Sequence, residues 1–175
     1  ESLVTLEAPV HIKVNNNSAI TIIATPTYLE DLAIGYLLDE NIVDSIEQIE
    51  SVESKGTEIS VKTKTDVTAR LEAVKMDQHV TSECVSLEHY LRLGDKIRLP
   101  EIKSDYAVNV SELRKMIKVF NSKRKNKAQP GGIHSASLFE KGEMKYYLID
   151  VSRHSAVDKV FGACARDDVD FAESI

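Results

Sequence analysis

The stretch KYYLIDVSRHSAVDKVFGACA, residues Lys145 to Ala165, predicts a strand, a short polar loop and a helix in direct succession. Aromatic and aliphatic side chains dominate residues 145–151, and residues 155–165 place apolar side chains at helical spacing. A strand followed by a helix is typical of an α/β layer, in which ligands collect beyond the carboxyl ends of the strands. Because Asp150 to His154 lie at such an end, we predict a ligand site there.

Charged side chains around this loop favour an anionic ligand. Arg153 and Lys159 would provide cationic donors to a phosphate or carboxylate group. His154 and Asp158 are four residues apart, so on a helix they share a face and the carboxylate could fix the imidazole tautomer. The alternative is a helix start that carries ordinary surface charges.

A second candidate loop lies upstream, after Pro130. Gly131 and Gly132 allow the backbone to approach a ligand closely. His134 follows at an expected helix start, where amide donors are free. A structural role for this histidine stays open, but two such loops in one small domain favour a functional site.

Residues 1–70 predict an α+β unit. Strands are expected over 3–14 and 19–24, and a second hairpin over 49–53 and 58–63. Between the hairpins, Thr27 and Glu30 have the spacing of a capping box for a helix that runs to about Glu40. Gly35 lowers the helix propensity unless another element packs closely there.

The second half begins with a polar segment, residues 72–86, which we interpret as a loop or domain junction that carries Cys84. A helix is expected over 109–124, capped by Asn109 or Ser111. Its apolar face has four members: Leu113, Met116, Ile117 and Phe120. The basic run at its end complements the helix dipole or binds phosphate. We therefore divide the chain into an amino-terminal domain (1–80), a junction (81–104) and an α/β domain (105–175).

Composition excludes several classes of protein. The 175 residues carry a net charge of -6, which gives no overall attraction to nucleic acid or an anionic membrane. No apolar run approaches the roughly 20 residues of a transmembrane helix, and no secretory signal is visible, so a cytoplasmic location is expected. With two cysteines, Cys84 and Cys164, the chain can form no four-cysteine zinc site, and no intrinsic metal is expected.

Several motifs, taken together and in this order, carry a resemblance to a known family. They are Glu7-Ala8-Pro9, Ile12 to Asn15, Ala24 to Leu37, Gly131 to His134, and Asp150 to Lys159. These residues resemble the formate dehydrogenase accessory sulfurtransferase (FdhD/NarQ) family. The resemblance implies a cytidine-deaminase-like fold for the second domain. It also implies that this domain is truncated, because family members continue beyond the position of Ile175.

The resemblance further implies a function in sulfur transfer. The protein would accept persulfide sulfur from a cysteine desulfurase and pass it to the molybdenum or tungsten bis-pterin guanine dinucleotide cofactor of formate dehydrogenase. Cys84 matches the sulfur-carrying cysteine, although many members have a Cys-x-x-Cys pair there and this chain has one cysteine. The cofactor contacts would be Gly131, Gly132, His134, Arg153, His154, Asp158 and Lys159.

The same residues bear on functions from other classes of protein. A zinc deaminase needs a His-x-Glu motif and a Cys-x-x-Cys motif. Here Ala136 stands in place of the glutamate and the cysteine pair is missing, so deamination is rejected. A cofactor-binding chaperone that moves no sulfur stays open, as do a homodimer and a buried structural role for Cys84.

Overall fold

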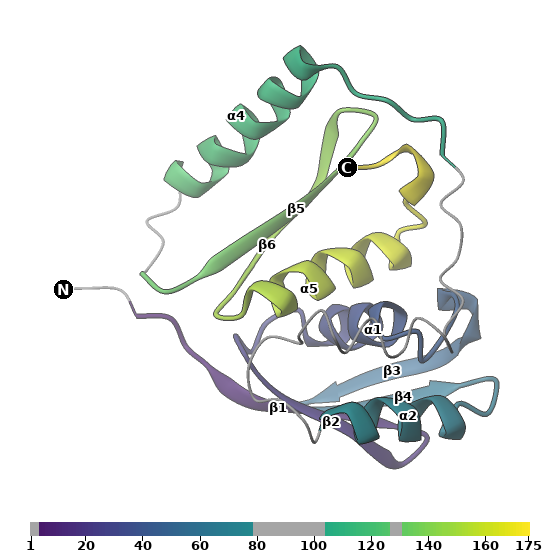
Figure 1. Cartoon of the computed structure of the whole chain (residues 1–175). Coiled ribbons are helices and arrows are strands. Elements are labelled where there is room, and N and C mark those ends of the chain that lie inside the picture. Colours follow the sequence, from purple (N-terminus) through teal and green to yellow (C-terminus); the bar gives the residue numbers. More distant parts are fainter. Residues whose placement is uncertain (1–3, 79–103, 127–130) are drawn as a thin grey trace.

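The computed structural model describes residues 4–78, 104–126 and 131–175 (Figure 1). Its strands are β1 (Ala8–Val14), β2 (Asn17–Ala24), β3 (Ile49–Lys55), β4 (Glu58–Thr63), β5 (His134–Glu140) and β6 (Glu143–Asp150). Its α-helices are α1 (Leu29–Asp39), α2 (Thr68–Gln78), α4 (Val110–Asn126) and α5 (Arg153–Arg166). Short 3-10 helices occupy Ile46–Gln48 and Phe171–Glu173.

Two hairpins joined by α1 form a four-stranded sheet in the order β2-β1-β4-β3. β1 is antiparallel to β2 and parallel to β4. The turns follow the local sequence: Asn15 and Asn16 adopt positive φ angles of 48° and 66°, and Gly56 one of 62°. Asparagine and glycine tolerate this conformation, so these residues place the two hairpin turns predicted from the sequence.

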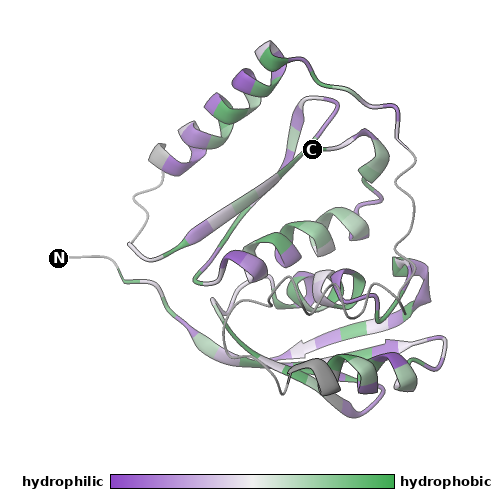
Figure 2. Cartoon of the chain, viewed as in Figure 1, coloured by the Kyte–Doolittle hydropathy of each residue, from purple (hydrophilic) through white to green (hydrophobic). Residues whose placement is uncertain are grey.

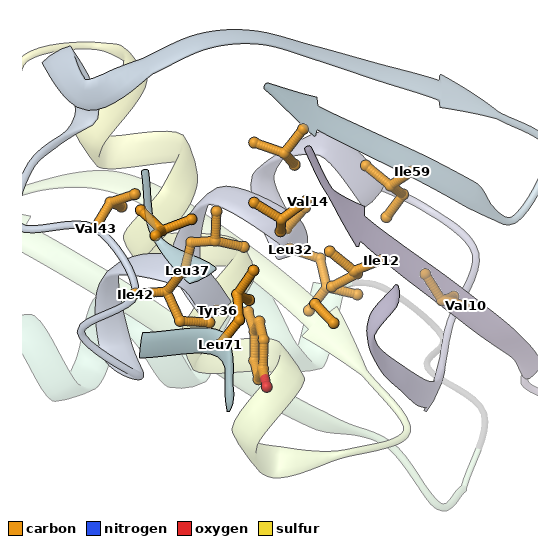
Figure 3. Packing of buried hydrophobic residues seen from close by; sticks show 14 of the residues in the cluster. Val10, Ile12, Val14, Leu32, Tyr36, Leu37, Ile42, Val43, Ile59 and Leu71 are labelled. Carbon is orange, nitrogen blue, oxygen red and sulfur yellow. The ribbon is translucent and has the colours of Figure 1, made fainter. Parts of the chain in front are cut away.

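The main core lies between this sheet and α1 (Figure 3). β1 alternates buried Val10, Ile12 and Val14 with more accessible residues, as a strand with one covered face should. From α1, Leu32 and Leu37 are fully buried against them. Burial of these apolar side chains fixes the sheet register, because a slip of one residue would expose the whole set.

A second helix, α5, crosses α1 on the side away from the sheet (Figure 1). The crossing occurs at two glycines. A Cβ atom added to Gly35 would lie closer than 3.0 Å to the backbone of Asp158, and one added to Gly162 would clash with the backbone of Asp31. Gly35 therefore has the close packing that its low helix propensity suggested.

The β5–β6 hairpin packs on α5 and also contacts α4. The rings of Phe120 and Tyr147 meet with centroids 5.4 Å apart, and Met116 is buried. The other two apolar residues of the predicted α4 face, Leu113 and Ile117, are 40% and 49% exposed. Ile175 pairs with Phe139 through two backbone hydrogen bonds of 2.7 and 2.8 Å.

Several expectations from the sequence need correction. His134 begins a strand rather than a helix, because Lys141 and Gly142 take positive φ angles and close a tight hairpin. Residues 68–78 form helix α2, in part of the segment interpreted as a loop. The predicted capping box is wrong: Tyr28 precedes α1 in a left-handed conformation and no side chain caps the helix.

The broader fold class is confirmed as mixed α and β. The division into residues 1–80, 81–104 and 105–175 stays a prediction, as do the cytidine-deaminase-like class of the second domain and its truncation. In the described parts of the chain, no helix combines the length and apolarity that a membrane span requires.

Candidate functional site

The open end of the β5–β6 hairpin brings the two predicted loops together. His134, the first residue of β5, pairs in register with Asp150, the last residue of β6. Gly131 and Gly132 therefore enter the hairpin where Ser152 to His154 leave it. The two motifs, well separated in the sequence, lie side by side at one end of the second sheet.

The side chains at this end face solvent. His134, Arg153 and His154 are exposed, and so are Gly131 and Gly132. A Cβ atom added to either glycine would meet no atom within 4 Å, and Gly132 has a φ angle of 79°. The glycines thus leave open space around a backbone that carries amide donors, next to three side chains that can also donate hydrogen bonds.

The first turn of α5 contributes to the same surface. Ser152 is the N-cap, and its Oγ accepts a hydrogen bond of 3.4 Å from the Ser155 amide. Arg153 and His154 are the first two helical residues, so they stand where the helix dipole and the leading amides favour negative charge. Figure 2 shows this hydrophilic start of α5 in purple, followed by the mainly hydrophobic turns that pack inside.

Lys159 does not belong to that surface. Its side chain is 0% exposed, and its Nζ donates to Asp150 Oδ2 at 2.6 Å and to the Thr25 carbonyl oxygen at 2.8 Å. Burial lowers the pKa of the Lys159 ammonium, and the Asp150 carboxylate opposes this shift. Because the ammonium is enclosed, the position of Lys159 does not fit the sequence-based prediction that it contacts the ligand directly.

Asp158 also lies inside, at the crossing of α1 and α5, with 8% of its surface exposed. Burial raises the pKa of its carboxyl group to about 7, and the nearby Asp39, Glu40 and Asp150 add to the shift. Among the described residues, no hydrogen bond joins the Asp158 carboxyl group to the His154 imidazole. The structure therefore gives no support to the expectation that Asp158 fixes the His154 tautomer.

The structure describes one of the two cysteines. Cys84, the predicted sulfur carrier, lies outside the described residues. Cys164 is fully buried on α5, and burial raises the pKa of its thiol to about 11. A thiol with so little thiolate is a poor nucleophile, which agrees with the core position that its helical spacing predicted.

The sequence reasoning placed Asp150 in the candidate loop but gave its side chain no role, and it did not connect Thr25 with this region. The Asp150 carboxylate accepts hydrogen bonds from the amides of Ser152 (2.8 Å) and Thr25 (3.1 Å) in addition to the one from Lys159. The only local signal was an aspartate two residues before the helix cap, which is typical of an Asx turn. The contact with Thr25 comes from the tertiary fold.

In chemical terms, this end of the molecule can receive an anion. It offers exposed histidine and arginine donors, glycine backbone and a helix N-terminus, next to the buried Lys159–Asp150 ion pair. Within residues 4–78, 104–126 and 131–175, no group of three or more His, Cys, Asp or Glu residues is arranged to hold a metal ion. The described chain is therefore a mixed α and β protein whose exposed histidine and arginine donors gather at one end of its second sheet.

Comparison with known proteins identifies the family. The model of the FdhD/NarQ family matches residues 5–175, and the chain therefore belongs to that family. A relative named sulfur carrier protein FdhD, from Listeria monocytogenes serotype 4b, is 29% identical over 170 residues, which are 95% of this chain and 65% of the relative. A protein of the same name from Xanthomonas axonopodis pv. citri is also 29% identical, over 97% of this chain and 62% of its own length.

One solved structure shares the fold. It is assigned to a formate dehydrogenase accessory protein from Desulfotalea psychrophila, and it superposes with a TM-score of 0.67 at 21% identity. The match covers 95% of this chain and 61% of that protein. The chain thus spans somewhat less than two thirds of the length of these relatives.

Proposed function

We propose that this protein is a sulfur carrier that takes persulfide sulfur from a cysteine desulfurase and passes it to a molybdenum or tungsten bis-pterin guanine dinucleotide, for activation of formate dehydrogenase. Membership of the FdhD/NarQ family supports the sulfur-carrier role, together with relatives named sulfur carrier protein FdhD. The observation that carries the acceptor half is the gathering of exposed Arg153, His154 and His134 side chains at the open end of the β5–β6 hairpin.

The chemistry of this surface fits the dinucleotide part of the acceptor. A pyrophosphate needs donors that converge without bulky side chains in the way. Arg153 and His154 at the start of α5 would bind its oxygens, and His134 would approach from the neighbouring strand. The backbone at Gly131 and Gly132 leaves the room that the ligand needs.

The sulfur-carrying half of the proposal rests on Cys84. Its thiolate would attack the outer sulfur of the donor persulfide, so that the S–S bond breaks and the donor cysteine leaves as a thiolate. Delivery to the acceptor requires two electrons, which convert the carried sulfur to sulfide and restore the Cys84 thiolate. A single cysteine cannot supply them by closing a disulfide, so an external thiol or the acceptor metal must do so.

The first test is intact-mass analysis after incubation with L-cysteine and a cysteine desulfurase. We expect a gain of one sulfur atom that dithiothreitol removes and that Cys84→Ala abolishes. Cys164→Ala is the matched control and should gain the sulfur, because its thiol is buried.

Lack of any sulfur on folded wild-type protein would reject the carrier. If that protein still bound guanosine diphosphate, the result would favour the cofactor-binding chaperone. Many family members have two cysteines where this chain has one. This difference is the reason to consider the second function.

A further inference from the structure

The Lys159–Asp150 pair is the most completely buried charged group in the described part of the chain, with both side chains 0% exposed. Such a pair contributes little net stability, because desolvation of two ions offsets most of their attraction. A core built only for stability would do as well with apolar residues. The location of the pair suggests what else it does.

The pair lies directly beneath the proposed ligand surface. Asp150 ends β6 opposite His134, and its Oδ1 accepts a 2.8 Å hydrogen bond from the Ser152 amide. That bond shapes the two-residue connection between β6 and α5. The next residues along the chain are Arg153 and His154, so the carboxylate sets the direction in which both side chains leave the turn.

Three further bonds fasten this turn to the other half of the molecule, all of them at Thr25 between β2 and α1. The Thr25 amide donates to Asp150 Oδ2 at 3.1 Å, and the Val151 amide donates to Thr25 Oγ1 at 3.2 Å. Lys159 Nζ joins the two sides by donating to both the Thr25 carbonyl and Asp150. Removal of Lys159 would leave two buried oxygen acceptors without their cationic donor.

We propose that Lys159 is a positioning residue: through Asp150 and Thr25 it holds the β6–α5 turn so that Arg153 and His154 meet the anionic ligand beside His134. This inference rests on the proposed acceptor site. The proposed role differs from direct contact with the ligand, because the Lys159 ammonium is enclosed by protein atoms.

The test compares Lys159→Met with Val160→Ala, a buried neighbour on α5 that lies outside the network and serves as a matched destabilised control. Both are measured at a temperature at which circular dichroism shows them folded. Guanosine diphosphate serves as the probe, with affinity read by calorimetry. We expect Lys159→Met to weaken binding about tenfold or more, as a displaced contact does, and Val160→Ala to leave it within about twofold.

A milder variant keeps the test valid if Lys159→Met does not fold. Thr25→Val removes only the acceptor for the Val151 amide and keeps the backbone groups that bind Lys159 and Asp150. We expect this change to weaken the affinity for guanosine diphosphate severalfold. Unchanged affinity in every folded network variant would overturn the inference.

A second readout separates this inference from the acceptor proposal. The imidazole C–H signals of His134 and His154 in two-dimensional NMR spectra report the turn without any ligand. They should shift or broaden in folded Lys159→Met or Thr25→Val and stay in place in Val160→Ala. If wild type fails to bind guanosine diphosphate, the acceptor site is rejected. These signals then decide whether Lys159 holds the turn: unchanged signals would overturn that role, and selective shifts would support it.

Discussion

Asp158 shows how a single side chain can act against stability. Its carboxyl group is buried where α1 and α5 cross, with acidic neighbours rather than a cation that would offset the burial. The pKa rises from the ordinary value of 3.8 to about 7. Between these two values the carboxyl ionises in the unfolded chain while it stays protonated in the folded protein, so unfolding becomes easier as pH rises.

Replacement of this carboxyl by a neutral amide should remove its contribution to the pH dependence of stability. We expect Asp158→Asn to be more stable than wild type at pH 8, by at most about 4 kcal/mol, with the difference shrinking toward pH 4. Urea unfolding followed by circular dichroism across this range measures the effect. Asp105→Asn, a change at an exposed aspartate, should leave the pH profile as it is.

Arg153 and His154 are the side chains on which the acceptor proposal depends most directly. A charge-assisted hydrogen bond is worth about 1.5–3 kcal/mol, so Arg153→Ala should weaken the binding of guanosine diphosphate by roughly tenfold or more. His154→Ala should act in the same direction. Val157→Ala, which truncates an exposed side chain one turn along α5, provides the control. Equal affinity in all three variants and wild type would remove these residues from the site.

At the scale of elements, the crossing of α1 and α5 depends on two residues without side chains. At Gly35 and Gly162 the backbones of the two helices touch, so any Cβ atom forces them apart. Small residues at a crossing allow helix axes to approach closely, and the gain is the burial of both helices against each other. This contact joins the layer of the four-stranded sheet to that of the β5–β6 hairpin.

Gly35→Ala should therefore destabilise the protein by about 3 kcal/mol, although alanine is the better helix former. Gly131→Ala is the control, because its added Cβ meets no atom within 4 Å and should change stability by less than about 0.5 kcal/mol. Thermal unfolding of the two variants gives the comparison. A neutral Gly35→Ala would mean that the helices are further apart than described.

Helix α4 begins with a reciprocal cap. The Glu112 amide donates to Asn109 Oδ1 at 3.0 Å, and the Asn109 amide donates to Glu112 Oε2 at 3.3 Å. Asn109→Ala should cost about 1 kcal/mol and increase amide exchange in the first turn of α4. Ser111→Ala tests the alternative cap considered from the sequence, and we expect it to have the smaller effect.

At the scale of the whole molecule, the described residues form two sheets that share one pair of helices. The four-stranded sheet packs on α1, the β5–β6 hairpin packs on α5, and the helices pack on each other. A two-stranded hairpin has little stability by itself and depends on such packing. We therefore expect unfolding to be a single transition.

The measurement is urea unfolding followed in parallel by far-ultraviolet circular dichroism and by hydrogen exchange at β1 and β6. The midpoints for the two sheets should coincide. Two separated midpoints would show that the sheets belong to independently stable domains, which is the arrangement that a division near residue 80 would favour.

Much of this architecture could be predicted from local sequence. The hairpins at Asn15-Asn16 and at Gly56 follow from residues that accept positive φ, and α1 and α5 follow from helical spacing. Strand β5 was harder to predict, because Gly131-Gly132 before His134 suggested the start of a helix. Its strand character depends on pairing with β6, which a local pattern does not contain.

The site was predictable only in part, because a local pattern does not contain the tertiary contacts. The loops at Gly131 and Asp150 were expected to act together, and the hairpin places them side by side. The enclosure of Lys159 could not be foreseen, because its partner Thr25 comes from the other half of the chain. Local sequence shows a lysine on a helix, and only the tertiary fold decides which way it points.

The burial of Cys164 has a practical consequence for work with thiol reagents. Cys164 is one of two cysteines in the chain. Because its thiol is enclosed and has a raised pKa, it should not react with maleimide or iodoacetamide in the native state. A fluorophore, spin label or affinity tag on such a reagent would then leave Cys164 unmodified in the folded protein. Modification of Cys164 by such a reagent therefore becomes a measure of whether the fold is intact.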